Sequence, residues 1–381
     1  MIPIPVLHFL KIIASIMAFN LKVAIVHDSL TQLGGAERVV EALHEMFPQA
    51  PVFVLVMDKK LEEKFFGWDI RTSWLQVVYN IIPKFQWLFP LIPLALYSFN
   101  FSGYDLVISS SSSFAKNVHV PKGTPHINYC HTPTRFLWTD QNYLEQELTG
   151  FLKLFRPLAR VILKWMKGWD YKRAQAVTHF IANSKEVQKR ILAYYNRTSV
   201  VIYPFVDTNF WHPVGEKSNY FLLAGRLQPH KRNEFIIEIF NSLGLPLHVA
   251  GTGRQENYLK ALAKSNITFL GRISDVELRK EYSGAVGFIY PQLEDFGLMP
   301  LEAAACGTAT LAFGRGGSLE TVIPGVTGEL FYEYSREIVS DKIENWNASR
   351  YGADNLRQHA EQFSEDKFKT AIAAEVDKIV N

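Results

Sequence analysis

The sequence predicts an α/β protein made of two domains, each an open parallel sheet covered by helices. At 381 residues the chain is longer than one ordinary hydrophobic core accommodates. A content of 48% hydrophobic and 20% charged residues is typical of a globular protein. Short apolar, β-branched runs alternate with helix-length segments, as in repeated βαβ units. This alternation occurs as two series, separated by a linker near residues 205–218.

The first series predicts a Rossmann-like domain over residues 21–205. Its apolar runs are continuous, which is typical of parallel strands covered on both faces. The strands are expected at 22–28 (KVAIVHD), 52–58 (VFVLVMD), 105–110, 126–130 and 179–184.

The second series predicts another Rossmann-like domain over residues 206–363. Its strands are expected at 220–226, 246–253, 267–272, 286–292 and 308–314. Two open parallel sheets that face each other across a cleft bind ligands at the carboxyl ends of their strands. Polar motifs directly after strands are therefore the candidate site residues.

Residues 1–20 (MIPIPVLHFLKIIASIMAFN) are apolar but fit no targeting pattern well. The basic start of a signal peptide is missing, and Pro3, Pro5 and Lys11 interrupt any spanning helix. An N-terminal extension and a membrane-touching helix both remain open readings.

Charge and cysteine content narrow the class of protein. Residues 1–200 hold 22 Lys and Arg against 14 Asp and Glu, whereas the remainder holds 18 against 23, so the first half favours anionic surfaces. Two distant cysteines, Cys130 and Cys306, exclude a disulfide scaffold and suit a reducing, cytoplasmic compartment. The basic residues are mixed with bulky aliphatic ones, which argues against nucleic-acid binding.

Two apolar segments of the first domain raise the question of a membrane. Segment 74–101 contains Pro83, Pro90 and Pro93, so it is not one transmembrane helix. Segment 150–174 carries seven cations and one acid among large apolar residues, a pattern typical of helices that lie in an anionic membrane surface. Packing of both segments inside the first domain is the alternative.

Two motifs follow strands of the first domain. Gly34 and Gly35 lie between a strand and a helix, where missing side chains let a backbone approach an anionic ligand. A simple tight turn explains the pair as well. His131 directly follows the strand 126–130, at the ligand edge of the sheet, and both a structural and a functional role remain open.

The second domain contains the stronger motifs. Gly225 and Arg226 end one strand and Lys231 follows after a Pro turn, so two cations converge on a point that suits a diphosphate. Glu294 and Glu302 stand eight positions apart in PQLEDFGLMPLEAAACGT, on either side of a Phe296-Gly297 turn that opens a helix. Backbone N–H groups of Gly297 and Leu298 would face an anion, and each carboxylate can accept hydrogen bonds from a vicinal diol.

In this combination of motifs, the chain resembles the family 4 retaining glycosyltransferases, which have the GT-B architecture. The resemblance covers nearly all of residues 21–381 and includes IANS at 181–184. GGAERV, YCHTP and YPFVD (203–207) are most similar to the bacterial branch that moves mannose from GDP-mannose onto lipid-linked or polysaccharide precursors.

The resemblance implies roles for the motif residues. Arg226 and Lys231 would bind the donor diphosphate, and Glu302 the ribose hydroxyls. Glu294 would hold the transferred sugar, with backbone contacts from Phe296, Gly297 and Leu298. His131 would lie near the reaction centre, and Gly34 and Gly35 near the phosphates or acceptor. The catalytic set would be His131, Glu294, Arg226 and Lys231, and Gly225, Gly34 and Gly35 would join the donor-binding set.

The resemblance also implies the domain roles and the location. Residues 21–205 would bind the acceptor and 206–363 the donor, and a C-terminal helix at about 364–381, N-capped by Ser364, would return to the first domain. No D-x-D triplet occurs in the chain, so neither a metal nor a cofactor is expected. The enzyme is expected in the cytoplasm or peripherally on the inner face of the cell membrane.

Two rival functions remain. One is a sugar-nucleotide epimerase or hydrolase on the same scaffold, which would turn over the donor without an acceptor. The other is a non-catalytic, nucleotide-sugar-binding subunit of a membrane assembly complex.

Overall fold

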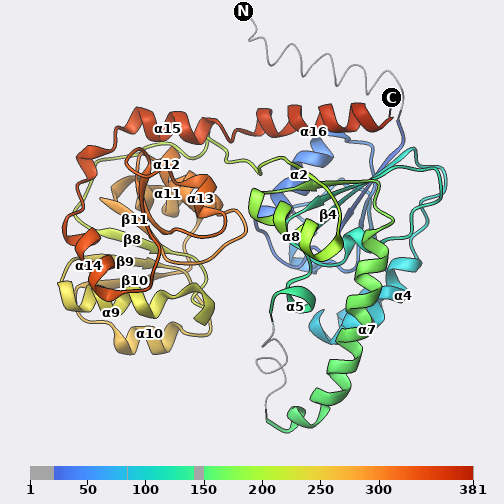
Figure 1. Cartoon of the computed structure of the whole chain (residues 1–381), viewed down its shortest axis with the longest axis horizontal. Coiled ribbons are helices and arrows are strands. Elements are labelled where there is room, and N and C mark those ends of the chain that lie inside the picture. The colour runs from blue at the N-terminus through green and yellow to red at the C-terminus, as the bar shows by residue number, and fades with distance from the viewer. Residues whose placement is uncertain (1–20, 84, 141–149, 381) are drawn as a thin grey trace, which may run out of the picture. The chain divides into compact units, whose positions relative to one another are not determined.

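The computed structural model describes residues 21–83, 85–140 and 150–380, so the expected N-terminal extension lies outside the described residues. The chain divides into two compact units (Figure 1). The first runs to Tyr203 and resumes at Phe368, and the second is Pro204–Lys367. Each unit contains one parallel sheet flanked by helices, which confirms the predicted α/β class.

The sheet of the first unit has the strand order β3-β2-β1-β4-β5-β6-β7, with every neighbouring pair parallel. Its strands are β1 Val23–His27, β2 Val52–Val54, β3 Ile70–Thr72, β4 Leu106–Ser111, β5 His126–Cys130, β6 His179–Ala182 and β7 Val200–Val201. Its α-helices are α2 Gly35–Met46, α3 Leu75–Ile81, α4 Ile92–Tyr97, α5 Arg135–Trp138, α7 Arg156–Ala174 and α8 Lys185–Tyr195. Short 3₁₀ turns are η1 Lys59–Leu61, η2 Phe85–Leu91, η3 Ala115–Asn117 and η4 Gly150–Phe155.

The sheet of the second unit has the order β10-β9-β8-β11-β12-β13 and is also parallel. Its strands are β8 Phe221–Ala224, β9 Leu247–Ala250, β10 Ile267–Gly271, β11 Gly287–Tyr290, β12 Thr310–Phe313 and β13 Gly328–Phe331. Its helices are η5 Pro229–Lys231, α9 Asn233–Leu243, α10 Glu256–Leu262, α11 Asp275–Gly284, α12 Leu298–Ala305, α13 Ser318–Thr321, α14 Arg336–Glu344, η6 Ala348–Arg350 and α15 Ala353–Glu361. The last helix, α16 (Glu365–Val380), begins directly after Ser364.

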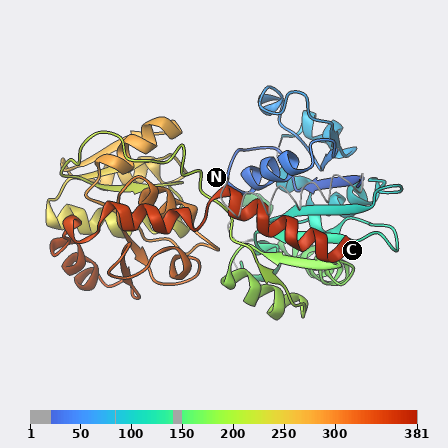
Figure 2. The ribbon, with the colours of Figure 1, turned by 90° about the horizontal axis from the view of Figure 1, so that it is seen from above.

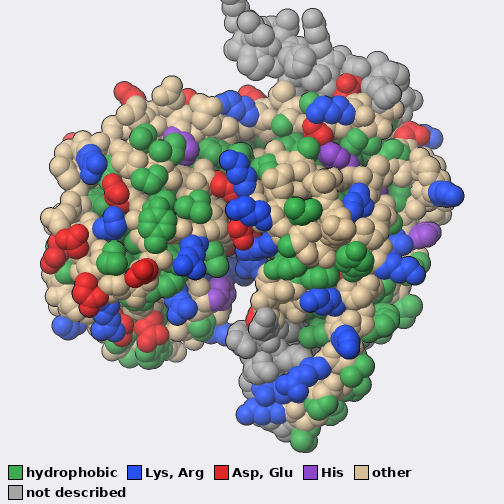
Figure 3. All heavy atoms as spheres, in the orientation of Figure 1, with side chains coloured by type: hydrophobic (Ala, Val, Ile, Leu, Met, Phe, Trp, Pro, Cys, Tyr) green, Lys and Arg blue, Asp and Glu red, His purple; other side chains and the backbone are tan. Residues whose placement is uncertain are grey.

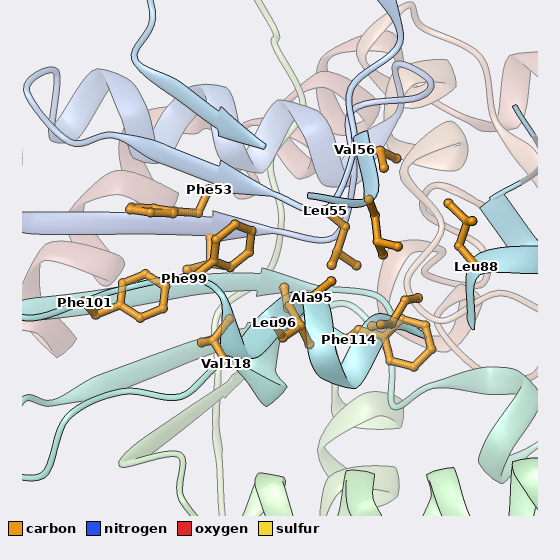
Figure 4. Close-up of a cluster of buried hydrophobic side chains, with 14 of the residues drawn as sticks. Phe53, Leu55, Val56, Leu88, Ala95, Leu96, Phe99, Phe101, Phe114 and Val118 are labelled. Carbon is orange, nitrogen blue, oxygen red and sulfur yellow. The ribbon is translucent and has the colours of Figure 1, made fainter. Parts of the chain in front are cut away.

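The proline-interrupted segment 74–101 forms part of the core of the first unit. It folds as α3, η2 and α4 rather than one long helix, as its prolines predict. Leu88, Leu96 and Phe99 pack with Phe53 and Phe114 in one buried cluster beneath the sheet (Figure 4). The alternative that this segment packs inside the domain therefore holds for only part of the segment. Among its described residues, the exposed large apolar side chains are those of Trp74, Val77, Ile81, Ile82, Leu91, Leu94 and Tyr97.

A buried polar network fixes α7 to this core. Asp170 and Lys116 are both fully buried, and the Lys116 Nζ donates to Asp170 Oδ1 at 2.7 Å. Trp138 Nε1 and Tyr195 OH each donate to Asp170 Oδ2 at 2.8 Å, so both carboxylate oxygens are satisfied. A buried ion pair is tolerated only when hydrogen bonds complete it in this way.

Within the residues that the structure describes, no helix has the length and apolarity needed to cross a bilayer. The same residues contain no cluster of three or more His, Cys, Asp or Glu side chains arranged to hold a metal ion.

Candidate functional site

The strongest motifs of the second unit meet at one edge of its sheet. Strands β8 and β11 are parallel neighbours, with Phe221 opposite Gly287 and Leu223 opposite Ile289. The loops that follow them therefore start side by side. One loop carries Gly225, Arg226 and Lys231, and the other carries residues 291–297.

Side-chain contacts join these two loops. The Lys231 ammonium contacts the Glu294 carboxylate, and both side chains are mostly buried. Gly225 has φ +130°, and a Cβ there would lie 3.8 Å from Met299 Sδ and 3.9 Å from Gln292 Oε1. The structure therefore brings together the cation and the acid that the sequence motifs place 63 positions apart.

The Phe-Gly turn opens helix α12 as the sequence predicts. Gly297 has φ +87°, a conformation that residues with a Cβ rarely adopt. A Cβ there would also lie only 3.2 Å from the Tyr290 hydroxyl, so both the backbone and the available space favour glycine. Helix α12 starts at Leu298, so its first N–H groups have no acceptor inside the helix and favour an anion. Phe296 is buried and contacts the ring of Phe363.

Glu302 lies one turn inside α12 and is buried. The hydroxyl of Tyr282 in α11 donates to its Oε2 at 3.5 Å. Burial, with the nearby Glu302 carboxylate as the next cause, raises the pKa of Tyr282 well above its usual value. The Tyr282 hydroxyl therefore keeps its proton and remains a donor to Glu302.

A glycine pair after β12, Gly316 and Gly317, supports the loop that carries Glu294. The sequence motifs did not predict this role. The N–H of Gly317 donates to the Glu294 carbonyl at 2.9 Å, and Glu294 forms an isolated parallel bridge with Gly316. A Cβ at Gly317 would lie 2.1 Å from the carbonyl oxygen of Phe296. The run of glycines in GRGGS (314–318), directly after an expected strand, was the available signal.

In the first unit, His131 follows β5 and lies at the carboxyl edge of the sheet. The backbone N–H of His131 donates to the Ser111 carbonyl at 2.9 Å, and the ring Nε2 lies 2.8 Å from Ser110 Oγ. Burial and the nearby His27 lower the pKa of His131 to about 3, so its imidazole is neutral at pH 7. A neutral imidazole at this edge can donate one hydrogen bond and accept another.

Gly34 and Gly35 form the entry to α2, with Gly34 as its N-cap. A Cβ at Gly34 would lie 3.1 Å from Glu37 Oε2, so the glycine leaves room for this buried carboxylate. Glu37 Oε1 in turn lies 3.6 Å from His27 Nε2. Packing against Glu37 thus explains the glycine at position 34, in addition to the expected role of the pair near a ligand.

Asp28, directly after β1, has a structural role that the sequence motifs did not predict. Its two carboxylate oxygens accept four backbone N–H groups, from Ser112, Ser113, Phe114 and Ala115, at 2.6–2.8 Å. Such charge-assisted bonds fix the turn after β4. No local sequence pattern predicts this role, because β1 and the turn are more than 80 residues apart in the sequence.

The predicted site residues therefore divide between the two units. His131, Gly34 and Gly35 lie in the first, and Gly225, Arg226, Lys231, Glu294, Phe296, Gly297, Leu298 and Glu302 lie in the second. Most of them lie in a loop after a strand or at a helix start, whereas Lys231 ends the turn η5 and Glu302 lies inside α12.

Comparisons with known proteins agree with this arrangement. Residues 33–210 match the family model "Glycosyltransferase Family 4", and residues 206–366 match "Glycosyl transferases group 1". Together the two models account for residues 33–366. The chain therefore belongs to the family 4 glycosyltransferases, a class with the two-domain GT-B fold.

Several of the relatives are named as mannosyltransferases. The O-antigen chain mannosyltransferase RfbU of Salmonella typhimurium is 28% identical over 40% of this chain and 46% of its own length. The alpha-1,3/1,6-mannosyltransferase ALG2 of Dictyostelium discoideum is 23% identical over 75% of this chain and 78% of its own length. The chain spans about half the length of RfbU and of several other curated relatives.

A solved structure shows the same fold. Anabaena Alr3699/HepE, crystallised in complex with UDP, superposes with a TM-score of 0.68 at 17% identity, over 94% of this chain and 100% of that one. The predicted GT-B fold is thereby confirmed.

Proposed function

We propose that the protein is a retaining glycosyltransferase that moves a sugar from a nucleotide-sugar donor to a lipid-linked or polysaccharide-precursor acceptor. The observation that carries the proposal is the contact of Lys231 with Glu294, made between loops that follow adjacent parallel strands. Mannose from GDP-mannose is the first donor to test, because RfbU and ALG2 are named as mannosyltransferases. UDP-sugars are the second class, because HepE was crystallised with UDP.

The Lys231–Glu294 pair suggests how the donor enters. A diphosphate offers Lys231 a stronger partner than a single carboxylate, and we assign Arg226, which precedes Lys231 in the same loop, to the same diphosphate. Once Lys231 has moved to the phosphates, the Glu294 carboxylate accepts hydrogen bonds from hydroxyls of the sugar. Donor binding thus replaces an ion pair inside the protein by two interactions with the ligand.

The chemical step follows from the same charges. As the glycosidic bond breaks, negative charge grows on the leaving diphosphate, and Arg226, Lys231 and the N-terminus of α12 stabilise it. These fixed positive groups take the part that a metal plays in other transferases, so we propose a metal-independent reaction without a cofactor. Within the second unit we assign Glu302 to the ribose hydroxyls of the donor, and His131 remains the candidate site residue of the first unit.

Substitution of Lys231 tests the proposal. Lys231→Ala should lower turnover at saturating donor by about 100-fold or more, because its ammonium acts mainly on the transition state. Lys260→Ala is the matched control, since Lys260 pairs with Glu256 on an exposed face of the same unit. Normal turnover of Lys231→Ala would remove this residue from the catalytic set and reject the proposed site.

Thermal unfolding with GDP-mannose, UDP-glucose and related donors identifies the donor. A ligand at about 100 times its Kd stabilises the native protein by about 2.7 kcal/mol, and Lys231→Ala should weaken that effect. Acceptor-independent consumption of the donor would favour an epimerase or hydrolase, and donor binding without any transfer would favour a non-catalytic subunit.

We also propose that the protein works peripherally at the cytoplasmic face of a membrane, where a lipid-linked acceptor would lie. Helix α7 buries Met166, Asp170 and Ala174, but together with the preceding turn η4 it leaves an apolar stripe exposed. This stripe consists of Leu154, Leu158, Val161 and Trp165. Lysines and arginines of the same segment gather beside it on the end of α7 that extends away from the sheet (Figures 1 and 3).

A further inference from the structure

Ser110 in β4 contacts the site histidine directly. The serine is fully buried, and its Oγ lies 2.8 Å from Nε2 of His131. The ring of His131 also packs edge-on against Tyr129, with 5.1 Å between ring centroids. The imidazole is therefore held by one hydrogen bond and one aromatic contact within its own unit.

The main chain of Ser110 is held from the other side by His27. A carbonyl oxygen can only accept, so Nδ1–H of His27 donates to the Ser110 carbonyl, at 3.0 Å. The other nitrogen of His27 faces Glu37. Burial lowers the pKa of His27, but Glu37 first, and then Asp28 and the Ser110 carbonyl, raise the pKa overall. Ser110 thus lies between the buried contact of His27 with Glu37 and His131.

The direction of the Ser110–His131 hydrogen bond decides which nitrogen of His131 carries the proton. A buried hydroxyl proton needs an acceptor, and Nε2 of His131 lies at the right distance from Ser110 Oγ. If Ser110 donates to Nε2, a neutral His131 must carry its proton on Nδ1. That N–H is then left to donate to a ligand.

We propose that Ser110 is a positioning residue that fixes His131 as the Nδ1–H tautomer, so that His131 presents a hydrogen-bond donor to a substrate oxygen at the carboxyl edge of this sheet. The part that concerns the substrate rests on the proposed function, whereas the tautomer does not. In this state His131 orients a substrate by donating a hydrogen bond and does not deliver a proton to the leaving group.

The tautomer is measurable without any substrate. In the full chain labelled with ¹⁵N-histidine, the His131 ring should show a protonated Nδ1 and an unprotonated Nε2, with the resonance assigned from the spectrum of His131→Gln. Ser110→Ala should abolish this preference. A protonated Nε2 in the wild-type protein, or an unchanged spectrum of Ser110→Ala, would overturn the proposal.

Kinetics test the consequence for transfer. Ser110→Ala should lower kcat by about tenfold, the equivalent of one hydrogen bond, with a smaller change in the donor KM. Ser110→Thr keeps the hydroxyl and should recover most of the rate.

Two neighbours in the same strand supply matched controls. Ser109 Oγ makes the same kind of contact at 2.7 Å, but with Nε2 of His126 at the start of β5. The buried Ser111 Oγ has no hydrogen-bond partner in the described part of the chain. Ser109→Ala and Ser111→Ala should leave kcat unchanged. An equal loss in Ser109→Ala would reduce the role of Ser110 to general packing and overturn the kinetic part. Failure of the wild-type protein to transfer sugar would reject the proposed function but would leave the assignment of the His131 tautomer intact.

Discussion

At the scale of single residues, Gly317 touches the loop of Glu294 through its main chain alone. A methyl group there would lie 2.1–2.3 Å from backbone atoms of Phe296, which no flexible side chain can relieve. Gly317→Ala should therefore shift this loop and cost about 1–3 kcal/mol of unfolding free energy. Donor-induced thermal stabilisation should fall at the same time.

The control for this prediction is Gly352→Ala in the same unit. Gly352 has φ −65°, and a Cβ there would lie 3.5 Å from its nearest neighbour, an ordinary contact. Its stability and its donor response should stay close to those of the wild-type protein. An unaltered donor response in Gly317→Ala would contradict the supporting role of the glycine pair.

Residues that act through sequence-local geometry were predictable. Gly297 and Lys231 take their places from the turn and loop that directly follow a strand, and the structure brings Lys231 to Glu294. Asp28 and Ser110 were not predictable, because their partners are supplied by neighbouring strands far away in the sequence. A short polar residue at the end of an apolar run gives no sign of which neighbour it will meet.

At the scale of elements, strand position was easier to predict than strand end. The run 52–58 predicts one strand, but β2 ends at Val54 and Asp58 instead caps η1, accepting from the Lys60 N–H at 3.0 Å. The edge strands β3, β7 and β13 were absent from the expectation. β3 and β7 are only partly buried, and β13 begins with Gly328 and Glu329, so none of them forms a continuous buried apolar run.

Helix α7 is the element that combines packing with an exposed apolar face. The double substitution Leu158→Ser with Trp165→Ala should reduce flotation with anionic vesicles about tenfold or more, because both side chains would insert among the lipids. Substitution of Lys153 and Lys164 by Glu should weaken binding mainly at low salt, since each lysine near an anionic surface contributes about 1 kcal/mol. Flotation at low and high salt measures both effects.

The matched control for α7 is Leu192→Ser in α8, which removes an apolar side chain of comparable exposure from another surface of the same unit. It should float like the wild-type protein. The absence of wild-type binding to anionic vesicles at both salt concentrations would reject the membrane proposal, and the exposed stripe would then need another partner.

At the scale of the whole molecule, the chain returns to its first unit after completing the second. The C-terminal helix α16 lies against the first unit (Figure 2). Phe368 is buried there and meets Tyr129 edge-on, with 5.6 Å between ring centroids. Tyr129 in turn contacts His131, so the last helix supports the aromatic ring on which the site histidine packs.

Phe368→Ala should therefore destabilise the first unit by about 3–5 kcal/mol through the cavity it leaves. Hydrogen exchange should accelerate in β5 and β6, while β11 and β12 keep their protection, and kcat should fall because His131 loses its support. Phe368→Leu should recover most of the loss, since it nearly conserves volume. Lys369→Ala removes an ion pair with the exposed Glu45 and should change stability by less than about 1 kcal/mol. Equal acceleration of exchange in both units would contradict this prediction, because it would mean that Phe368 supports the two sheets alike.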